Sequence, residues 1–416
     1  MKSKVAITGI GMVTPLGITT HDCWENMVAG KSGIDLIRQF DTSGCITKIG
    51  GQIPDSYFSL EKAYFSENQL IRTSLPNRLS LYCVKQAIDD SQIVLNRMDS
   101  QNISVISGSG GSSYGDEISE MEKELGMQLA PGWEMLDAHA AIVGREFGFQ
   151  GPCFNVATAC SSGAFAVGLG YDHVINNHGV CIVIGVDTML LKDTVVGFNQ
   201  LMALSEHNQF PNKASRPFDK KRSGFVISDG ACAIILEPYD WAVARNARIY
   251  AVISGYAMTS EAYNIMAPEP GGAGMAETMR LALIRSGIGI DNIGYINAHG
   301  TSTIHNDLAE TQAIKLVFGE RASQIPVSSQ KSMIGHTIGA AGTIETAVTA
   351  LTLYNQIITP TINYEEPDPL CNLDYVPNQS RLVSGLSSAL TNSFGFGGHN
   401  CTVALEINLP YDTYAG

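Results

Sequence analysis

Long hydrophobic runs and an excess of basic charge are both missing from this sequence of 416 residues. No segment reaches the ~18 consecutive apolar residues that a membrane span requires. The chain begins MKSK and continues directly into VAITGIGMVTPLG, without a hydrophobic signal segment. Lys and Arg number 26 against 40 Asp and Glu, and the net charge of −14 argues against general affinity for nucleic acid or anionic membranes. We therefore expect a cytoplasmic protein that binds neither.

A disulfide framework is missing too, because the nine cysteines are odd in number and have no tight spacing. We expect reduced thiols, as in the cytosol. No low-complexity tract or long charge run indicates a disordered tail. What the sequence does have is hydrophobic residues, at 44%. That fraction suffices for a large core and, at ~150 residues per domain, for two or three domain-sized units.

Short β-branched runs alternate with longer runs of small residues, a pattern that predicts an α/β fold. The runs are apolar throughout, which favours mostly parallel sheets covered by helices on each side. The composition changes at EPYDWAVARNARIY, where a strand ends and a charged helix leads into a new strand, so we place a boundary between residues 1–240 and 241–416. The predicted strands are 4–10, 102–108, 180–186, 231–237, 248–256, 293–299 and 401–407. The predicted helices are 79–90, 116–125, 161–176, 276–286, 307–318 and 340–355.

The two halves echo each other in one feature. Residues 159–177 and 335–356 each place a reactive residue before a helix rich in Gly, Ala and Ser. Side chains this small let a helix approach neighbouring backbone closely. The sequence therefore predicts two buried central helices, one in each half.

Cys160 stands at the start of the first of these helices, in TACSSG. Unpaired N–H groups and the helix dipole at that place favour a thiolate and can also hold an oxyanion. A packed, inert thiol is the common alternative, since free cysteine is among the most buried residue types. The segment alone leaves both interpretations open.

A second group of polar residues lies in YINAHGTSTIHND. A strand delivers His299 into a turn, and a histidine at a strand exit in a polar loop is a good catalytic candidate. Thr301 and Thr303 can donate to a polar ligand, whereas we interpret His305 as an ordinary loop residue. Asp307 resembles an N-cap for the next helix.

Two further motifs follow. In SSQKSMIGHTIGAAG, Lys331 and His336 precede Glu345 on an apolar background, where charged groups need partners. A structural salt bridge between Lys331 and Glu345 is the plain alternative, and it is compatible with catalysis. In NSFGFGGHN, glycines alternate with aromatic rings, so that backbone N–H groups can face a substrate while an aromatic ring gates access. A plain glycine-rich turn before the last strand is the alternative.

The four motifs TACSSG, NAHGTST, KSMIGHTIGAAG and NSFGFGGHN, in this order, closely resemble those of the elongating β-ketoacyl-acyl-carrier-protein synthases, of type II. VAITGIGMVTPLG, ALSEHNQFPNKASRPFDKKRSGF and INYEEPDP resemble the same family, so the similarity covers essentially the whole chain. It implies a thiolase-like fold, in which two similar α/β halves form five alternating layers, αβαβα. It also implies a homodimer, or a heterodimer with a chain-length-factor-like subunit.

The resemblance assigns a role to each matching position. Cys160 would accept an acyl chain from acyl carrier protein, with the oxyanion held by the N–H groups of Cys160 and Phe396. His299 and His336, donating from Nε2, would bind the thioester carbonyl of malonyl-acyl carrier protein and stabilise the enolate left by loss of CO₂. The enolate would attack the acyl group and lengthen it by two carbons, in fatty acid biosynthesis. Lys331 completes the catalytic set, and Phe396 matches the family's gate residue.

Other positions would support this chemistry. The resemblance makes Lys331 and Glu345 a network that fixes His336, and makes Thr301 and Thr303 contacts to the phosphopantetheine arm. No cofactor is expected to be required. A monovalent cation occurs in some relatives near the positions that match Asn297, Glu310, Glu345 and Asn392.

The motifs also separate this chain from nearby families. Initiating synthases have Asn where His336 stands, and thiolases have a second cysteine within the C-terminal glycine motif. Chain-length-factor proteins lose the nucleophile, which is present here as Cys160.

Some positions depart from the family pattern and support an alternative, a ketosynthase of a specialised polyene or polyketide pathway. Gly110 or Gly111 replaces a bulky residue, which predicts a wider acyl pocket. Substitutions that could retune the pocket or the dimer contact are Ile304, Ser228 and Cys232. The basic residues available to meet an acidic carrier protein are few, namely Arg72 and Arg78, with a second patch of Lys213, Lys220, Lys221 and Arg222.

Overall fold

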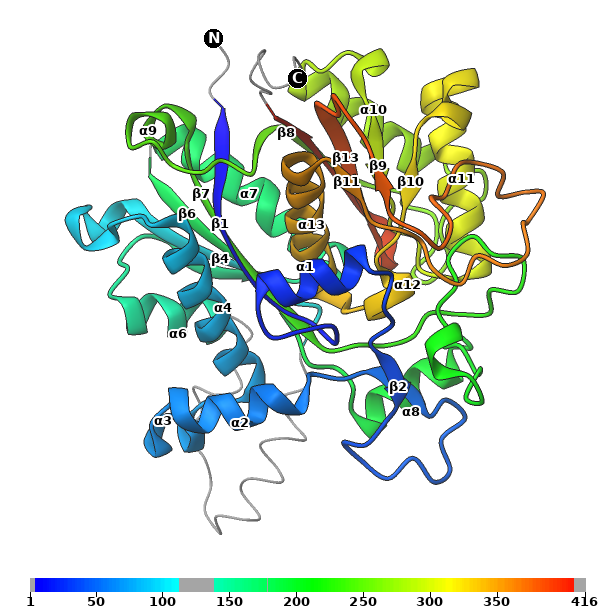
Figure 1. The fold of residues 1–416 in the computed structure, drawn as a ribbon, viewed down its shortest axis with the longest axis horizontal. Coiled ribbons are helices and arrows are strands. Elements are labelled where there is room, and N and C mark those ends of the chain that lie inside the picture. Colours follow the sequence, from blue (N-terminus) through cyan, green and yellow to red (C-terminus); the bar gives the residue numbers. More distant parts are fainter. Residues whose placement is uncertain (1–3, 112–137, 178, 408–416) are drawn as a thin grey trace.

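A ten-stranded mixed sheet is the frame of the structure, a computed structural model that describes residues 4–111, 138–177 and 179–407 (Figure 1). Five strands come from the first half of the chain: β1 (Val5–Val13), β4 (Ile103–Gly108), β5 (Cys153–Val156), β6 (Val180–Asp187) and β7 (Gly230–Pro238). Five come from the second half: β8 (Ala251–Ser260), β9 (Tyr295–Asn297), β10 (Val327–Ser328), β13 (Ser388–Gly395) and β14 (His399–Glu406).

The strand order shows that the similarity between the two halves extends to the whole sheet. The order is β5-β4-β6-β7-β1 in the first half and β10-β9-β13-β14-β8 in the second. When each set is numbered along the chain, both read 3-2-4-5-1. The two sets are joined where β1 pairs with β8 in antiparallel register, Val5 opposite Ile253. The fold is therefore an α/β unit used twice.

The prediction of mostly parallel sheets is wrong. Four of the nine pairings are parallel, namely β4 with β5 and β6, and β9 with β10 and β13. The other five are antiparallel. The strands are apolar on both faces because helices cover both faces, and that pattern does not depend on strand direction.

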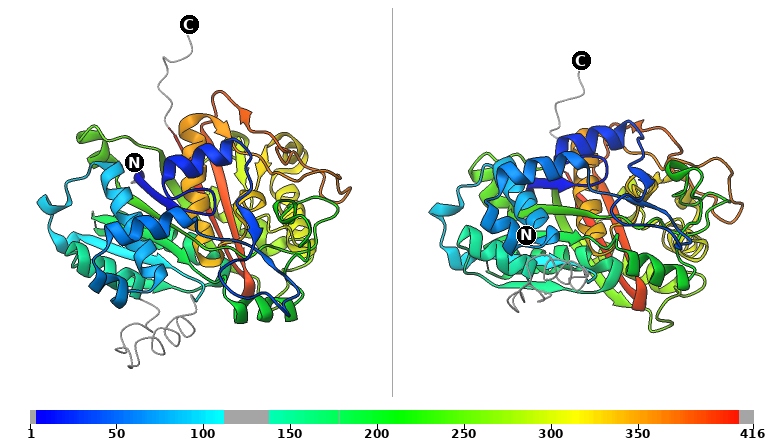
Figure 2. Two further views of the ribbon diagram at one scale, coloured as in Figure 1. Left: turned by 60° about the horizontal axis from the view of Figure 1, so that its bottom comes forward. Right: turned by 90° about the horizontal axis from the view of Figure 1, so that it is seen from below.

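Helices form three layers around the two halves of the sheet, as the views in Figures 1 and 2 show. The central layer is α7 (Ser162–Asn177) and α13 (Ala341–Asn355), which contact each other and strands of both halves. On one outer side α4 (Leu75–Ser91) and α6 (Ala138–Phe147) pack on the first-half strands. On the other, α10 (Ala273–Ser286) packs on the second-half strands and α11 (Ile304–Phe318) packs on α10. The five alternating layers are confirmed.

Small residues bring the two central helices into contact. A Cβ added to Gly342 would lie 2.3 Å from the backbone nitrogen of Ala164, and one added to Gly163 would lie 2.7 Å from the carbonyl oxygen of Gly339. Both are far inside van der Waals contact, so no larger residue fits. The prediction that the small residues after Cys160 serve helix packing is confirmed.

Most predicted helices match observed ones within a few residues, and the prediction at 116–125 lies outside the described residues. Strand β13 was not predicted, because Thr391, Asn392 and Ser393 make it look polar although it is buried. The remaining elements are α1 (Thr20–Val28), β2 (Ile34–Leu36), β3 (Ile49–Gly51), α2 (Asp55–Tyr64), α3 (Glu67–Arg72), α8 (Lys192–Gln200), α9 (Tyr239–Ala244), α12 (Lys331–Ile334), β11 (Ile357–Ile358) and β12 (Arg381–Leu382).

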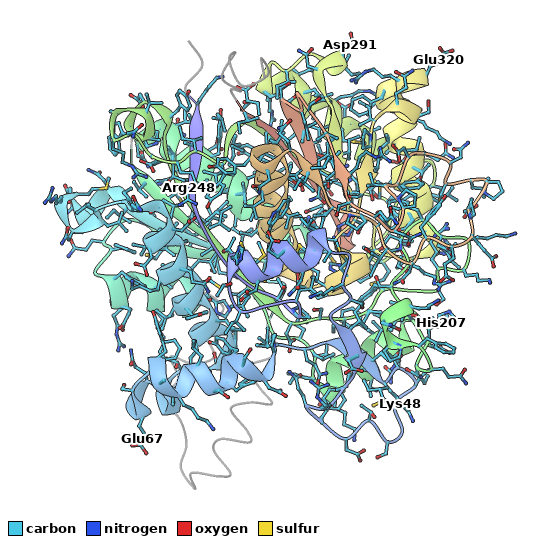
Figure 3. The ribbon with its side chains drawn as sticks, viewed as in Figure 1. Lys48, Glu67, His207, Arg248, Asp291 and Glu320 are labelled. Carbon is cyan, nitrogen blue, oxygen red and sulfur yellow. The ribbon has the colours of Figure 1, made fainter. Side chains whose placement is uncertain are left out.

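Charged side chains follow the usual distribution over most of the fold. Glu67, Asp291 and Glu320 project from its outer edge in Figure 3. No helix within the described parts of the chain has the length and apolarity to cross a bilayer. Lys331, Glu345 and Glu310 depart from this distribution, since all three are buried in the interior. Charge is rarely buried without a partner or a function.

Candidate active site

Cys160 lies on a sharp turn between β5 and α7. It is the middle residue of the short 3-10 segment Ala159–Ser161 (η4), and Ala159 before it has a left-handed φ of 50°. The Ser162 hydroxyl fastens the turn, since it accepts from the Thr158 N–H at 2.8 Å and donates to the Ala159 carbonyl at 2.6 Å. A non-glycine residue in this conformation costs energy, and such strain is concentrated at functional sites.

The thiol of Cys160 is neutral in the resting protein. Burial raises its pKa to about 11, although Lys331 and the backbone N–H groups of Phe396 and of Cys160 itself act to lower it. The stabilisation of a thiolate that we expected from the start of the helix is therefore smaller than the destabilisation of the thiolate by burial. Those same N–H groups are in place to stabilise negative charge when it develops.

His299 is held by bonds to its backbone and to its ring. It follows β9, and its backbone N–H donates to one oxygen of Glu310 while the Gly300 N–H donates to the other, each at 2.8 Å. Lys331 Nζ lies 3.4 Å from His299 Nδ1. Because an ammonium can only donate, Nδ1 accepts and the ring proton is on Nε2.

His336 reaches the same tautomer by another route. The backbone N–H of Ile338 donates to its Nδ1 at 3.2 Å, so Nε2 carries the proton. Among the described residues, Nε2 of His336 has no hydrogen-bond partner although it is buried. Burial and the charge of Lys331 hold the pKa of His299 and of His336 well below the usual range, so both rings are neutral. An unpartnered buried donor of this kind is ready to meet a substrate oxygen.

The three reactive side chains converge. Cys160 Sγ and a ring nitrogen from each of His299 and His336 all lie within 4.8 Å of one another. The two imidazole rings stand edge to face, 5.4 Å between centroids. Such a Cys–His–His set has donor types that zinc accepts. Nδ1 of each histidine already accepts a hydrogen bond, and each Nε2 carries a proton where a metal would need a lone pair. The set is therefore better suited to provide one nucleophile and two hydrogen-bond donors than to bind a metal.

Lys331 and Glu345 form a buried ion pair behind the histidines. Burial raises the pKa of Glu345 to about 7, and Lys331 opposes this shift. The second oxygen of Glu345, Oε2, has no partner among the described residues, and neither has Oδ1 of Asn297. The amide of Asn297 donates to the Glu345 carbonyl at 3.2 Å, which ties the two residues together.

Glu310 has a structural task that the sequence did not indicate. Both of its oxygens accept from the backbone turn that carries His299, and Asn392 Nδ2 lies 3.3 Å from Oε1. Burial raises its pKa to about 7. Gly300, with a φ of 38°, allows the tight turn. Glu310 thus fixes where the His299 ring lies.

The glycine and phenylalanine loop follows β13 and contacts the nucleophile turn. A Cβ on Gly395 would lie 2.9 Å from the Thr158 carbonyl, so a glycine is needed for this close approach. Gly397, at a φ of 79°, donates its N–H to the Ile265 carbonyl at 2.7 Å. Phe396 lies between them and lines the same cavity as Cys160.

A cavity of about 300 Å³ connects these groups to the surface. Predicted site residues on its wall are Cys160, His299, His336, Thr301, Thr303 and Phe396. The hydroxyls of Thr301 and Thr303 lie 2.9 Å apart, and Thr303 also caps α11. Lys331 and Glu345 stand behind the wall, so they can position groups but do not line the cavity.

Asp187, at the end of β6, is a residue of this region that the sequence analysis missed. Its buried carboxylate accepts from the Ser109 hydroxyl at 2.6 Å, the Gly110 N–H at 2.8 Å and the Gly339 N–H at 2.6 Å. Gly339 follows Ile338, whose N–H is bonded to His336. Asp187 therefore clamps the loop after β4 to the turn that holds His336.

The departures from the family pattern have structural explanations. A Cβ on Gly110 would lie 2.7 Å from Ile338, so Gly110 serves close packing, whereas a Cβ on Gly111 would have no atom within 4 Å. Of these two glycines, Gly111 is the one with no described atom near its Cβ position. Ser228 and Cys232 are fully buried in the core, and neither lines the cavity, so their expected effect on the pocket is wrong.

The predicted basic patches are mostly neutralised. Arg78 is bonded to Glu61 at 2.9 Å and is largely buried, and Arg222 is buried against Asp368 at 2.7 Å. Lys213 and Lys221 pair with Glu365 and Glu366. Lys220 is exposed, and the side chain of Arg72 lies outside the described residues. The proposed roles of Arg78 and Arg222 in carrier binding are wrong, because acidic side chains distant in sequence already hold them.

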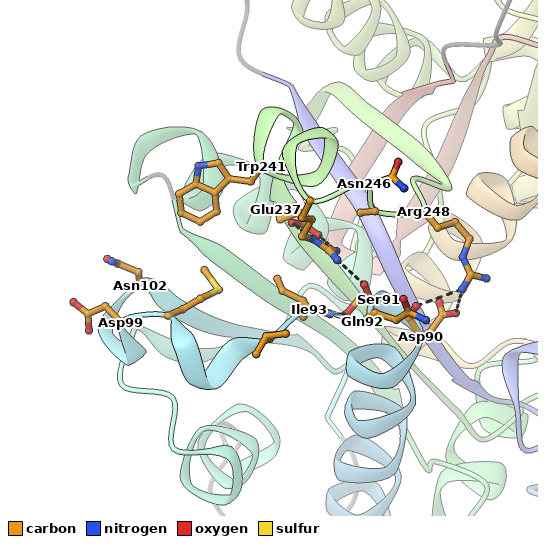
Figure 4. A pocket seen from close by; sticks show the side chains of 14 residues that line it. Asp90, Ser91, Gln92, Ile93, Asp99, Asn102, Glu237, Trp241, Asn246 and Arg248 are labelled. Carbon is orange, nitrogen blue, oxygen red and sulfur yellow. Dashed lines mark hydrogen bonds and ion pairs between the residues drawn. The ribbon is translucent and has the colours of Figure 1, made fainter.

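A second hollow, of about 630 Å³, lies where α4, β7 and α9 meet (Figure 4). Four of its five charged residues are paired with one another, Asp99 being the exception. Arg248 bonds to Asp90, and Arg245 bonds to Glu237 at 2.6 Å. The hollow is larger than the Cys160 cavity, but it lacks a nucleophile and histidines among its described lining residues.

Comparison with known proteins agrees with the geometry. The family described as Beta-ketoacyl synthase, N-terminal domain matches residues 2–242, and the one described as Beta-ketoacyl synthase, C-terminal domain matches residues 250–365. A 3-oxoacyl-[acyl-carrier-protein] synthase 2 of Synechocystis sp. is 38% identical, covering 97% of this chain and 98% of the relative.

Two solved structures are also similar. A type II polyketide synthase ketosynthase, in complex with its acyl-carrier protein and bound to the hexaketide, has a TM-score of 0.86 at 31% identity, over 98% of this chain and all of that chain. The ishigamide ketosynthase/chain length factor has a TM-score of 0.87 at 27% identity over the same shares. The thiolase-like fold is thereby confirmed, and this chain belongs to the β-ketoacyl synthase family.

Proposed function

We propose that this protein elongates acyl chains on acyl carrier protein in fatty acid biosynthesis, by decarboxylative condensation with malonyl-acyl carrier protein. The observation that carries the proposal is the convergence of Cys160 Sγ with two imidazoles, within 4.8 Å, whose protons are held on Nε2. One nucleophile and two fixed neutral donors suit a reaction that first holds an acyl group and then stabilises an enolate.

In the first step Cys160 takes the acyl group. The sulfur attacks the thioester carbonyl, and the N–H groups of Cys160 and Phe396 receive the charge on its oxygen. The intermediate collapses with cleavage of the carbonyl–sulfur bond to the carrier. The proton of the Cys160 thiol passes to the departing carrier thiolate, so the step is balanced.

In the second step the histidines bind the malonyl thioester. Nε2–H of His299 and of His336 donates to its carbonyl oxygen, and the bond to the carboxylate breaks to release CO₂. The electron pair forms an enolate whose oxygen the two donors stabilise. The enolate carbon attacks the acyl group on Cys160, and the thiolate that leaves is reprotonated. The two steps use the two thioesters, the protein's own groups and one proton from solvent, which restores the thiol of Cys160.

Neutral imidazoles suit this role better than charged ones. A charged His336 would attract the malonyl carboxylate and hold it, whereas a neutral donor binds the carbonyl and lets CO₂ depart. Burial, with the added charge of Lys331, lowers the pKa of both rings and keeps them neutral, and Lys331 also fixes the tautomer of His299. Lys331 is thus a positioning residue in this proposal.

The acceptor atoms of Asn297 and Glu345 that lack partners fit a monovalent cation. Asn297 Oδ1 and Glu345 Oε2 are both buried acceptors. Glu310 and Asn392 fit less well, because their oxygens already accept from His299, Gly300 and Thr402. A cation held by Asn297 and Glu345 would supply positive charge that offsets the carboxylate.

We further propose that two copies pair through β5. This strand is one edge of the ten-stranded sheet, and Phe154 on it is exposed. The opposite edge, β10, is covered, since the Val327 N–H donates to the Asp374 carbonyl at 2.7 Å. An open strand edge readily pairs with a second strand. Gel filtration with light scattering should give a dimer, and Phe154→Lys should weaken it.

A second candidate is a ketosynthase of a specialised polyene or polyketide pathway. It is favoured by the open space at Gly111 and by the similarity to a polyketide ketosynthase at 31% identity. In this case the partner would be a chain-length-factor-like subunit. Turnover with saturated, polyenoyl and aryl primers on acyl carrier protein separates the candidates. Extension of saturated primers supports fatty acid elongation, and extension of polyenoyl or aryl primers alone would exclude it.

A further inference from the structure

Four exposed apolar side chains surround the opening of the Cys160 cavity. Met202 is 88% exposed, Ile265 77%, Ile304 57% and Leu201 50%, and all four line that cavity. They come from three separate segments, namely the turn after α8, the loop after β8 and the first residue of α11. Single exposed apolar residues are ordinary, but a group around one opening indicates a binding surface. We call these four residues the collar.

Positive charge is scarce around the same opening. Among the described residues that line the cavity, none is Lys or Arg. The carboxylate in the lining, Glu261, is already bonded to the Asn400 amide at 2.9 Å and to the Glu269 N–H at 2.8 Å. Lys213 and Lys221 are matched by Glu365 and Glu366. With a net charge of −14, the chain as a whole repels an acidic partner at long range.

We propose that the carrier protein docks on the collar through apolar contacts, and not chiefly through ion pairs. The inference rests on the proposed function, since the cavity that Cys160 lines in the described part of the chain is the route by which a thioester would reach it. The body that carries the thioester must then sit on the rim of the opening, where most exposed side chains are apolar and the exposed polar ones include Asn264 and His305. Its matching surface, around the attachment point of its pantetheine arm, is therefore apolar.

Apolar docking has a distinct dependence on salt. Ion pairs at an interface weaken as salt screens them, so an electrostatic complex has a KM that rises with ionic strength. Here salt screens only the repulsion between two acidic proteins and leaves apolar burial in place. The KM for malonyl-acyl carrier protein is therefore expected to stay level or fall between about 50 and 500 mM NaCl.

The test measures KM and kcat for carrier-borne substrate in collar variants of the full chain. Met202→Ser/Ile265→Ser is expected to raise KM about tenfold, which corresponds to ~1.4 kcal/mol, with a smaller change in kcat. Leu382→Ser is the matched control, because Leu382 is 81% exposed on β12 and lies outside the collar. Its KM is expected to stay within about twofold of the parent.

A separate measurement isolates the chemistry. The parent protein is incubated with a small acyl thioester, acyl-N-acetylcysteamine, and the acylated residue is found by mass spectrometry. Acylation of Cys160 supports the proposed function without involving docking, and its absence refutes that function. If Cys160 is acylated but KM rises severalfold with salt, or the collar variant behaves like Leu382→Ser, apolar docking is overturned while the function stands.

Discussion

The two halves of the molecule share one strand order but contribute different chemistry. In the first half, the turn before α7 supplies Cys160, a neutral thiol in a strained turn. In the second half, the end of β9 and the turn before α13 supply two imidazoles, and the ion pair of Lys331 and Glu345 lies behind them. A duplicated fold has thus placed a nucleophile and a polar donor network on opposite sides of one cavity.

The two halves hold their reactive groups in position in different ways. The first half uses hydroxyl-to-backbone bonds around Cys160, which need no charge. The second half holds the buried charges of Glu310, Lys331 and Glu345 around the histidines, and each of these two carboxylates accepts from a donor. We therefore expect substitutions in the second half to affect both stability and rate, whereas substitution of Cys160 affects rate alone.

Cys160→Ala gives the largest expected effect. With no sulfur to accept the acyl group, condensation should fall by at least ~10³-fold. The melting temperature should change little, since one sulfur atom in a small site is removed. Condensation is measured by product formation from acyl- and malonyl-acyl carrier protein. Retention of condensation by the alanine variant would remove Cys160 from the mechanism.

Lys331→Met has the next largest expected effect. It leaves Glu345 buried without its partner, which costs about 3–5 kcal/mol of unfolding free energy, and it removes the donor to His299. The double variant Lys331→Met/Glu345→Gln should recover most of the stability but not the rate, which we expect to remain ~100-fold low. Urea unfolding and decarboxylation assays measure the two effects. Recovery of both together would show that the pair is only structural.

Asp187→Asn tests the link between the halves. An amide in place of the carboxylate turns one acceptor into a donor, facing the N–H groups of Gly110 and Gly339. We expect a loss of about 1–3 kcal/mol in stability and of about tenfold in decarboxylation rate, because the His336 turn shifts. Ser109→Ala is the control, since it removes one donor and leaves the clamp. Equal effects from the two variants would argue against a specific role for Asp187.

The smallest effect concerns pH. Burial and Lys331 lower the pKa of His299 and His336, so acid must go well below their usual value of 6.5 to protonate them. In Glu345→Gln, which lacks the titration of that carboxyl, decarboxylation should therefore stay level from pH ~8 to ~6.5 and decline only at lower pH. Because the pKa of Glu345 is about 7, Glu345→Gln serves as the control for its titration. If the decarboxylation rate fell to half its plateau at or above pH 6.5 in both the parent protein and Glu345→Gln, the imidazoles would not be neutral and shielded as described.

Local patterns in the sequence predicted much of this site, and distant pairing accounts for most of what they missed. The motifs around Cys160, His299, His336 and Phe396 each lie on a turn next to a strand or helix, so they could be recognised locally as candidates, whereas the roles expected of them came from the family resemblance. Arg78 looked like a surface cation, but Glu61 from another helix holds it. Such partners, distant along the chain, are visible only after folding.

In the fold, too, some features could be predicted from local patterns and others could not. The buried central helices were predictable because Gly and Ala recur along them, and small residues have few other uses in a helix. Strand direction was not predictable, since burial on both faces makes parallel and antiparallel strands look alike. Polar residues on β13 concealed a central strand, because Thr391, Asn392 and Ser393 are polar side chains that are nevertheless buried. Asp187 gave no local signal, as its donors come from two distant loops.

The proposed function assigns a separate partial reaction to each half, and one crossed measurement distinguishes the two reactions. Cys160→Ala and His336→Ala are each assayed for acyl-enzyme formation, by mass spectrometry, and for CO₂ release from malonyl-acyl carrier protein. We predict that Cys160→Ala loses acylation but still releases CO₂, and that His336→Ala is acylated at Cys160 but releases CO₂ at least ~10²-fold more slowly. Acylation at another residue, or undiminished CO₂ release from His336→Ala, would contradict this assignment.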